Sequence, residues 1–336
     1  MTTAERNTFE IAGRPIGPGH PPYVVAELSA NHNGDLGRAL AVVEMAKDAG
    51  ADAVKLQTYT ADTMTIDHDS PEFRISGGLW DGRSLHELYE EAHTPWDWHE
   101  AIFARGRELG ITVFSAPFDA TAVDLLESLD APAYKIASGD VTHLPLLRHV
   151  AGFGKPIVLS TGGATLEEVE TAVDTIRQAR TDTPIAILHC VSQYPAEPGE
   201  ANLACMAGLR TRFACPTGYS DHTVGIATCL AAAALGAEVI EKHFTLDRAL
   251  PGPDHKASVE PGEPVPAKVV TWPVSISIFR ILWVPRSVTY RKVPFVTKPL
   301  GRSNDALVPI PSVDPAVPLP AKVVTSPVAI TTLRIL

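Results

Sequence analysis

The sequence predicts a (β/α)8 TIM barrel, which is a closed ring of parallel strands with helices outside it. Short apolar runs rich in β-forming residues alternate with amphipathic helical runs from residue 23 to residue 244. Several helical runs end in glycine directly before the next strand, as the C-terminus of a helix often does. The units recur at a spacing of roughly 30 residues and give a total near the ~250 residues usual for this barrel. An open, doubly wound sheet is the alternative, but eight regular units favour closure.

Each strand candidate is a short apolar run of the length expected for a buried strand. In chain order the candidates lie at 23–28, 52–57, 111–116, 133–138, 156–161, 184–190, 216–221 and 238–244. Helical periodicity marks the segments at 36–50, 94–110, 119–130, 142–154, 165–180 and 223–236. The connection from residue 58 to residue 93 is long, and connections of that length usually serve as lids or binding segments. Its GGLWDGR stretch at 77–83 is typical of a turn that carries an aromatic side chain.

The chain divides into a lead-in at 1–22, the barrel at 23–260 and a different tail at 261–336. The tail holds nine Lys or Arg against three acidic residues, and thirteen prolines that forbid a helix of ordinary length. Its PAKVVTWPVSISIFRIL returns at the end of the chain as PAKVVTSPVAITTLRIL. We therefore expect a barrel without a normal eighth helix, followed by an irregular Pro-rich tail. A frame-shifted or recombined end is one hypothesis for the tail, and a Pro-rich β-like appendage is another.

Composition excludes several classes of partner. The formal net charge of −11 over 336 residues argues against nucleic acid, whose phosphates require a basic surface. The N-terminus carries charges where a signal peptide needs an apolar core, and the longest apolar run is far too short to span a membrane. The four cysteines lack the spacing of a metal finger or a redox pair. We expect a cytoplasmic protein with neither a nucleic-acid nor a membrane partner.

Polar side chains end nearly every predicted strand, and in this barrel the active site lies at the C-terminal ends of the strands. Buried polar groups are costly unless they are satisfied, so this ring predicts a polar ligand. Lys55 and Lys135 would repel each other in an empty mouth. An anion offsets this repulsion, since a charge pair at ~4 Å is worth about 1 kcal/mol in water and about 4 kcal/mol at a shielded surface. Phosphate or carboxylate is the expected guest. The alternatives are that each lysine pairs with a local acid, or that one forms a Schiff base.

His222 and His243 end the seventh and eighth predicted strands, which are neighbours in a closed barrel. Imidazoles on adjacent strands can share one metal ion and leave coordination positions open for a substrate. The alternative is that both are structural histidines, since two such side chains without a third ligand are weak evidence.

Taken together, the motifs resemble the sialic acid synthases, which condense phosphoenolpyruvate (PEP) with an N-acetylated amino sugar. The matching segments occur in order from residue 23 to about residue 258: AELSANHNGDL, AGADAVKLQTYTADTMTID, FSAPFD, AYKIASGD, STGGATLEEV, LHCVSQYP, GYSDHTVGI and EKHFTLDRALPGPDHKAS. No single segment is decisive, whereas eight in order on eight predicted strands are highly specific.

The resemblance implies roles for individual residues. It places Glu27, Lys55 and Lys135 at the reacting centre. It implies that the phosphate and carboxylate of PEP are held by Lys55, Ser115, Lys135, Ser138, Ser160, Ser192 and Ser220, although the family often has another polar residue in place of Ser192. It places the sugar beside Gln57, Tyr194 and Asp254. It assigns a divalent metal, Mn²⁺ first and Mg²⁺ or Co²⁺ as alternatives, to His222 and His243.

Within that family, the segments at 27–34, 56–67 and 77–99 look like the pseudaminic acid synthases. The second half is closer to the N-acetylneuraminate and legionaminate synthases. We favour the pseudaminate branch because the long second loop is its distinctive part. Family members continue with an eighth helix and a small antifreeze-like domain, which reaches across a homodimer and supplies an arginine to the partner's sugar site. The tail matches neither, so a dimer is doubtful here, and an inactive barrel remnant is the competing hypothesis.

Overall fold

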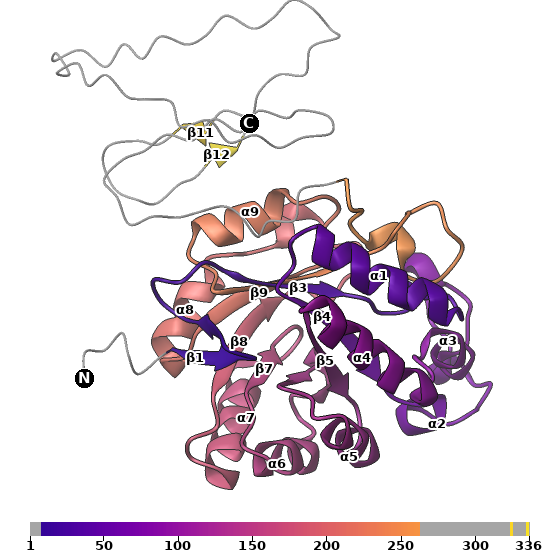
Figure 1. The fold of residues 1–336 in the computed structure, drawn as a ribbon, viewed down its shortest axis with the longest axis horizontal. Coiled ribbons are helices and arrows are strands. Elements are labelled where there is room, and N and C mark those ends of the chain that lie inside the picture. The colour runs from indigo at the N-terminus through magenta and orange to yellow at the C-terminus, as the bar shows by residue number, and fades with distance from the viewer. Residues whose placement is uncertain (1–7, 263–322, 325–333, 336) are drawn as a thin grey trace, which may run out of the picture. The chain divides into compact units, whose positions relative to one another are not determined.

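The computed structural model describes residues 8–262, 323–324 and 334–335. Residues 8–262 contain a closed barrel of eight parallel strands in the order β10-β3-β4-β5-β6-β7-β8-β9 (Figure 1). The predicted fold class is therefore confirmed, and each strand overlaps its predicted segment. The strands are β3 (Tyr23–Glu27), β4 (Ala53–Thr58), β5 (Thr112–Pro117), β6 (Tyr134–Ile136), β7 (Ile157–Ser160), β8 (Ile185–Cys190), β9 (Thr217–Asp221) and β10 (Val239–His243).

Helices cover the outside of the barrel, except for α2 and α3, which belong to the long connection after β4. They are α1 (Leu36–Asp48), α2 (Ala61–Met64), α3 (Leu85–Ala92), α4 (His99–Leu109), α5 (Ala120–Ser128), α6 (Leu144–Gly152), α7 (Leu166–Ala179), α8 (Cys205–Phe213) and α9 (Ala227–Ala234). The hydrophobic pattern had marked neither α8 nor the short helices α2 and α3. After β10, the described chain forms one 3₁₀ turn, η7 (His255–Ala257), before residue 262.

The predicted Pro-rich tail lies outside the described residues, apart from two short strands. These strands, β11 (Val323–Val324) and β12 (Arg334–Ile335), pair antiparallel with each other. The predicted absence of an eighth helix also concerns positions beyond residue 262, so it stays a prediction. Within the described chain, no helix is both long and apolar enough to cross a membrane.

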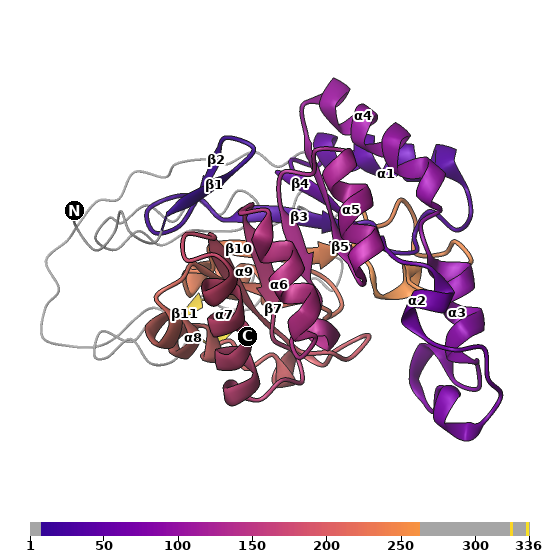
Figure 2. The ribbon, with the colours of Figure 1, turned by 90° about the horizontal axis from the view of Figure 1, so that it is seen from below.

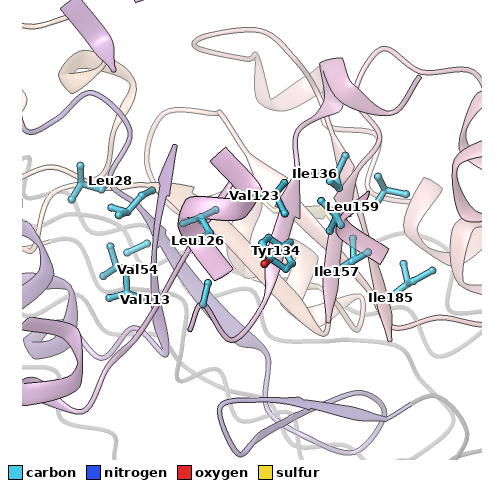
Figure 3. Packing of buried hydrophobic residues seen from close by; sticks show 14 of the residues in the cluster. Leu28, Val54, Val113, Val123, Leu126, Tyr134, Ile136, Ile157, Leu159 and Ile185 are labelled. Atoms are coloured by element: carbon cyan, nitrogen blue, oxygen red, sulfur yellow. The ribbon is translucent and has the colours of Figure 1, made fainter. Parts of the chain in front are cut away.

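Two apolar layers hold the barrel, and the period-two alternation of the strands separates them. Side chains that point outward, such as Val54, Val113 and Leu159, pack against the helices and form the larger cluster (Figure 3). Side chains that point inward, such as Phe114 and Val158, form a second cluster inside the barrel. The same alternation decides which polar side chain at each strand end faces the interior.

A short hairpin closes the N-terminal end of the barrel. Strands β1 (Phe9–Ile11) and β2 (Arg14–Ile16) pair antiparallel, and Ile11 and Ile16 are fully buried in the interior apolar cluster. The sequence had placed only an undefined lead-in here. In Figure 2 the hairpin lies at one end of the barrel, whereas the segment with α2 and α3 lies at the other. The hairpin therefore closes one end of the apolar interior, which leaves the C-terminal end as the place for a ligand.

The long connection after β4 is folded rather than irregular. It contains α2, the 3₁₀ turns η2 (Pro71–Phe73) and η3 (Gly78–Trp80), and α3. Gly77 and Gly78 have φ values of 81° and 76°, a backbone region that glycine adopts without strain. The predicted turn carrying an aromatic side chain is confirmed by Trp80.

Candidate active site at the barrel mouth

Strand register brings the predicted site residues to one level at the C-terminal end of the barrel. His243 on β10 is the register partner of Glu27 on β3, and Glu27 is the partner of Lys55 on β4. On the other side of β10, Glu241 is the partner of Ser220 on β9. These side chains share the inward-facing parity of their strands, so they converge in the mouth.

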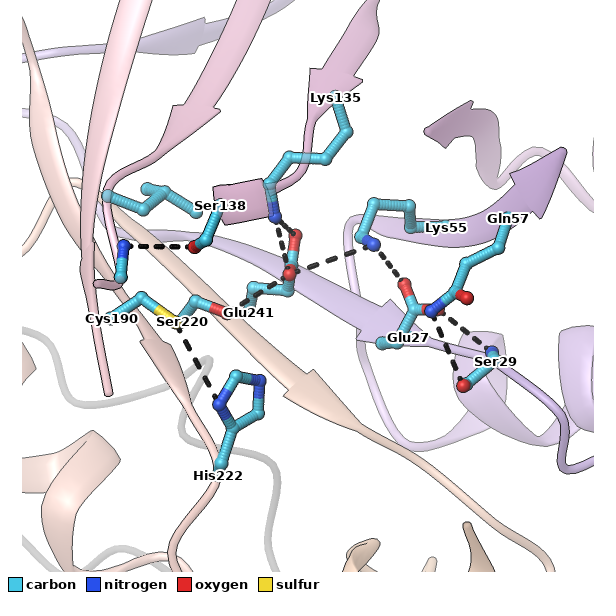
Figure 4. A network of polar contacts seen from close by, with 12 residues as sticks. Glu27, Ser29, Lys55, Gln57, Lys135, Ser138, Cys190, Ser220, His222 and Glu241 are labelled. Carbon is cyan, nitrogen blue, oxygen red and sulfur yellow. Dashed lines mark hydrogen bonds and ion pairs between the residues drawn. The ribbon is translucent and has the colours of Figure 1, made fainter. Parts of the chain in front are cut away.

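A buried carboxylate that the sequence had not singled out joins the two lysines (Figure 4). The two oxygens of Glu241 lie 2.6 and 2.8 Å from Lys135 Nζ, and Oε1 lies 3.7 Å from Lys55 Nζ. Lys55 Nζ also lies 2.5 Å from Oε2 of Glu27. The alternative in which each lysine pairs with a local acid is therefore what the structure contains. The two ammonium groups are therefore not unpaired as expected, because Glu241 lies between them and offsets their repulsion.

The charges of this network depend on one another. Burial disfavours the charged form of Lys55, but the carboxylates of Glu241 and Glu27 outweigh it and raise the pKa of Lys55. Burial, helped by the neighbouring Lys55, lowers the pKa of Lys135 despite the contact with Glu241. Burial would raise the pKa of Glu241, but the two ammonium groups overcome it and lower that pKa. Glu241 therefore stays ionised, and Lys135 is the lysine whose proton is held less firmly.

Hydroxyl groups line a recess beside the lysines. Ser160 ends β7 facing inward, and its buried hydroxyl has no hydrogen-bond partner among the described residues. The Gly162 amide donates to Ser138 Oγ at 2.9 Å. A Cβ atom at Gly162 would collide with the Ser192 hydroxyl and lie 3.0 Å from Ser138 Oγ, so these groups crowd around one backbone position. Ser220 Oγ donates to Glu241 Oε1 at 3.1 Å. A buried hydroxyl without a partner marks a place where a ligand oxygen or a water completes the site.

Ser115 does not belong to this recess, which corrects its predicted place in the mouth. It has the outward parity of Val113, and its Oγ lies 2.6 Å from Thr58 Oγ1, which in turn contacts His99 Nε2 of helix α4 at 2.8 Å. A shift of one residue along a strand moves a side chain to the other face. The inward position at that level is the neighbouring Ala116, which offers no polar group.

The two predicted metal-binding histidines meet across the β9–β10 edge, with ring centroids 5.3 Å apart. His222 Nδ1 donates to the Val191 carbonyl at 2.8 Å, and His243 Nδ1 shares a 3.0 Å contact with Asp254 Oδ2. Burial and the neighbouring His243 lower the pKa of His222 to about 4. Burial lowers the pKa of His243, but the Asp254 carboxylate outweighs it and gives a net rise. With each Nδ1 occupied, both Nε2 atoms remain without a partner among the described residues.

The residues predicted to contact a sugar surround this pair. Gln57 Nε2 donates to Glu27 Oε1 at 3.1 Å, and the Tyr194 ring lies 4.1 Å from the His222 ring and 5.5 Å from the His243 ring, centroid to centroid. Asp254 holds the imidazole of His243, a contact that the sequence prediction had not included. One side of the mouth is thus ionic, and the other is built from imidazole and aromatic rings.

The sequence pattern missed two residues of the mouth. Glu241 lies two positions before His243 and therefore on the same face of β10, so strict alternation identifies it. Trp80 was singled out only as part of a turn, and its indole Nε1 donates to the Pro253 carbonyl at 2.9 Å. No sequence signal reports that contact, because it joins segments far apart in the chain.

Fold and mouth together define a (β/α)8 barrel enzyme whose site combines ammonium groups, hydroxyls and a pair of imidazoles. The NeuB family model matches residues 42–265, and the chain belongs to the NeuB family. Among curated relatives, the pseudaminic acid synthase of Helicobacter pylori is 45% identical over 240 residues, which cover 71% of this chain and 70% of that protein.

Other relatives carry related names. The N,N'-diacetyllegionaminic acid synthase of Campylobacter jejuni is 41% identical over 242 residues, covering 71% of this chain and 72% of that protein. Among solved structures, the N-acetylneuraminic acid synthetase of Leptospira borgpetersenii in complex with citrate matches with a TM-score of 0.69 and 34% identity. It covers 77% of this chain and 85% of that one. Relatives from all three branches thus resemble this chain.

Proposed function

We propose that this enzyme condenses PEP with an N-acetylated amino sugar, releases phosphate and forms a nine-carbon 2-keto sugar acid of the pseudaminic type. The observation that carries the proposal is the convergence, on one barrel end, of Lys55, Lys135 and the hydroxyl recess with the pair His222 and His243. The names of the relatives support the same chemistry, since they are synthases of pseudaminic and legionaminic acids and a synthetase of N-acetylneuraminic acid.

The hydroxyl recess supports the binding of PEP. The orphaned Ser160 hydroxyl, the crowded Ser138 and Ser192 hydroxyls and the Lys135 ammonium together offer several donors to one phosphate. In this proposal Lys55, which is bridged to Glu27, would bind the carboxylate of PEP. The citrate complex of the Leptospira protein shows that a polycarboxylate binds that relative. Charge-assisted donors of this kind orient an anion and turn an encounter of two substrates into a nearly unimolecular step.

The imidazole pair fits a divalent metal ion such as Mn²⁺. Ligating histidines usually donate their second ring nitrogen to a carboxylate or backbone carbonyl, and His222 and His243 do so to Val191 and Asp254. No group of three His, Cys, Asp or Glu side chains that could hold a metal occurs within the described chain. The remaining positions would therefore belong to water and substrate. When bound, such an ion supplies Lewis acidity that polarises a carbonyl group.

The protein groups account for the rest of the chemistry. C3 of PEP is a weak nucleophile, so it must be held against the aldehyde carbon of the acceptor. Bond formation leaves C2 electron-poor, water attacks C2, and phosphate then departs to leave the 2-keto acid. Glu27, bonded to Lys55 and Gln57, lies where a carboxylate can pass a proton between water and the acceptor oxygen. Lys135, whose pKa is lowered, would lie beside the departing phosphate in this proposal.

The direct test is phosphate release from PEP in the presence of Mn²⁺. Acceptors should be the N-acetylated amino sugars that lead to pseudaminic, legionaminic and N-acetylneuraminic acids, compared at equal concentration. We expect the highest kcat/KM with the pseudaminic precursor. Turnover with another acceptor alone would move the enzyme to that branch.

Two outcomes would contradict the proposal itself. Absence of phosphate release with every acceptor, in a protein shown to be folded by circular dichroism, would favour the inactive barrel remnant. Borohydride trapping of a carbonyl substrate on Lys135, with activity insensitive to EDTA, would favour a Schiff-base aldolase. The lowered pKa of Lys135 is the specific observation that makes this second candidate worth testing.

A further inference from the structure

Trp80 anchors the long β4–α3 connection over the mouth. Its indole Nε1 donates to the carbonyl of Pro253, the residue directly before Asp254. Its ring lies 5.8 Å from the ring of Tyr194, centroid to centroid, and Tyr194 stands against both site histidines. Tyr194 therefore contacts the histidine pair, and Trp80 in turn contacts Tyr194.

The chemistry that Trp80 can offer a ligand is narrow. The indole has a single polar donor, and that donor is occupied by the Pro253 carbonyl. What remains is an apolar ring that is only partly buried. The neighbouring Tyr194 also presents an aromatic ring to this part of the mouth. This part of the mouth is thus suited to an apolar group of a ligand, whereas the lysine side is suited to a charged group.

We propose that Trp80 is a specificity-determining residue of the acceptor site. Its ring contacts a methyl group, either of an acetamido substituent or of a deoxy carbon, on the half of the sugar farthest from the aldehyde. This inference rests on the proposed function, which places the aldehyde beside His222 and His243. An open-chain amino sugar that starts there and passes Tyr194 reaches the indole with its far end. A methyl group gains from contact with an aromatic ring, whereas a hydroxymethyl group would lose hydrogen bonds to water there.

The experiment measures kcat, the KM of the acceptor and the KM of PEP in Trp80→Ala and Trp80→Phe. For an acceptor with a distal methyl group, we expect Trp80→Ala to raise the acceptor KM about tenfold, as the loss of one methyl-to-ring contact predicts. The kcat and the KM of PEP should change less than twofold. Trp80→Phe keeps an apolar ring but cannot donate to Pro253, so it should keep the acceptor KM within about threefold of wild type.

Two matched acceptors distinguish the sources of the methyl group. One lacks the distal acetamido group, and the other carries hydroxymethyl in place of the terminal methyl. The acceptor that loses its sensitivity to Trp80→Ala identifies which methyl contacts the ring. Sensitivity that persists in full with both acceptors would overturn the proposal.

A control variant separates contact from loop disturbance. Leu79 precedes Trp80 in the same turn and is 39% exposed, so Leu79→Ala should leave every constant unchanged. An equal rise of the acceptor KM in Leu79→Ala, or in Trp80→Phe, would overturn the proposal, because anchoring of the loop would then explain the effect. If the wild type releases no phosphate, the proposed function fails separately. Saturation-transfer NMR with the unreactive alditol of the acceptor then tests the contact, and equal transfer in wild type and Trp80→Ala overturns it.

Discussion

Glu241 holds the two lysines of the mouth together, and its replacement by glutamine is the sharpest test of that network. Gln keeps the size of the side chain and removes its charge. Lys135 then loses the carboxylate that contacts it at 2.6 and 2.8 Å, and Lys55 keeps only Glu27. Lys135 is 3% exposed, so bulk water solvates the unpaired ammonium group poorly.

The expected loss in the free energy of unfolding follows from the burial of the ion pair. Removal of one partner from a buried ion pair typically costs 3–5 kcal/mol, because the other charge stays buried and unpaired. Gln still accepts one hydrogen bond, so we expect about 3 kcal/mol. For a domain of this size, 1 kcal/mol corresponds to about 2–4 °C in Tm, which predicts a fall of about 6–12 °C. The surface pair Arg105–Glu44 has exposed fractions of 33% and 46%, so the matched control Glu44→Gln should cost less than about 1 kcal/mol.

The assay is thermal unfolding in the absence and presence of inorganic phosphate. If the lysines bind an anion, phosphate should replace the missing carboxylate and stabilise Glu241→Gln more than wild type, by up to about 2.7 kcal/mol at 100 times its Kd. A Tm for Glu241→Gln within about 2 °C of wild type would refute the role of Glu241 in stability. Equal gains from phosphate in the two proteins would show that phosphate does not replace the Glu241 carboxylate, and no gain in either protein would refute the anion site.

Other predictions address the remaining groups of the mouth. His222→Ala and His243→Ala should each lower Mn²⁺ affinity at least about tenfold by isothermal titration, and unchanged binding in both would exclude the metal site. Ser160→Ala should raise the KM of PEP about fivefold without a change in Tm. Ser115→Ala should instead lower Tm and leave that KM unchanged, and the reverse pattern would contradict the assignment of their faces. A further prediction concerns Asp140, which lies in the 3₁₀ turn Ser138–Asp140 after β6. Burial raises the pKa of Asp140 to about 7, so stability that depends on its proton is present at pH 4 and is lost as the pH rises through 7. Asp140→Asn should therefore lose less Tm than wild type between pH 5 and pH 8, and parallel curves would contradict the shift.

Most of the barrel was predictable because each strand and most of the helices outside the barrel have a local signal in the sequence. Hydrophobic periodicity found all eight strands, and polar residues at strand ends located the mouth. Helix α8 lacks such a signal, since only Met206 and Phe213 of its nine residues are buried. The hairpin at residues 9–16 has strands of three residues, which are too short to show alternation. Its Ile11 and Ile16 pack against the interior of the closed barrel, a contact that cannot be predicted before the barrel is known.

Errors at the site arose because the prediction did not fix which residues of each strand point into the barrel. Ser115 was assigned to the mouth because it lies near the end of its strand, yet Phe114 fixes the inward parity and turns Ser115 toward helix α4. The prediction took His243 as the functional residue of this strand and passed over Glu241, two positions earlier. Lys242 points outward and pairs with Asp221 at 2.8 Å. Parity relative to a buried neighbour would have corrected both assignments, whereas the contact between Trp80 and Pro253 depends on the folded loop.

The pairing of lysines with carboxylates constrains what the mouth can bind. Within the described mouth, Lys55 and Lys135 are offset by Glu27 and Glu241, so the buried site is close to neutral without a ligand. A trianionic phosphate ester entering alone would leave excess negative charge in a medium that penalises it. A divalent cation entering alone beside the imidazoles would leave excess positive charge. Each guest offsets the charge of the other, so a site of this composition is suited to an anion and a metal ion bound together. The lysines and carboxylates of the mouth can therefore remain paired when an anion and a metal ion bind together.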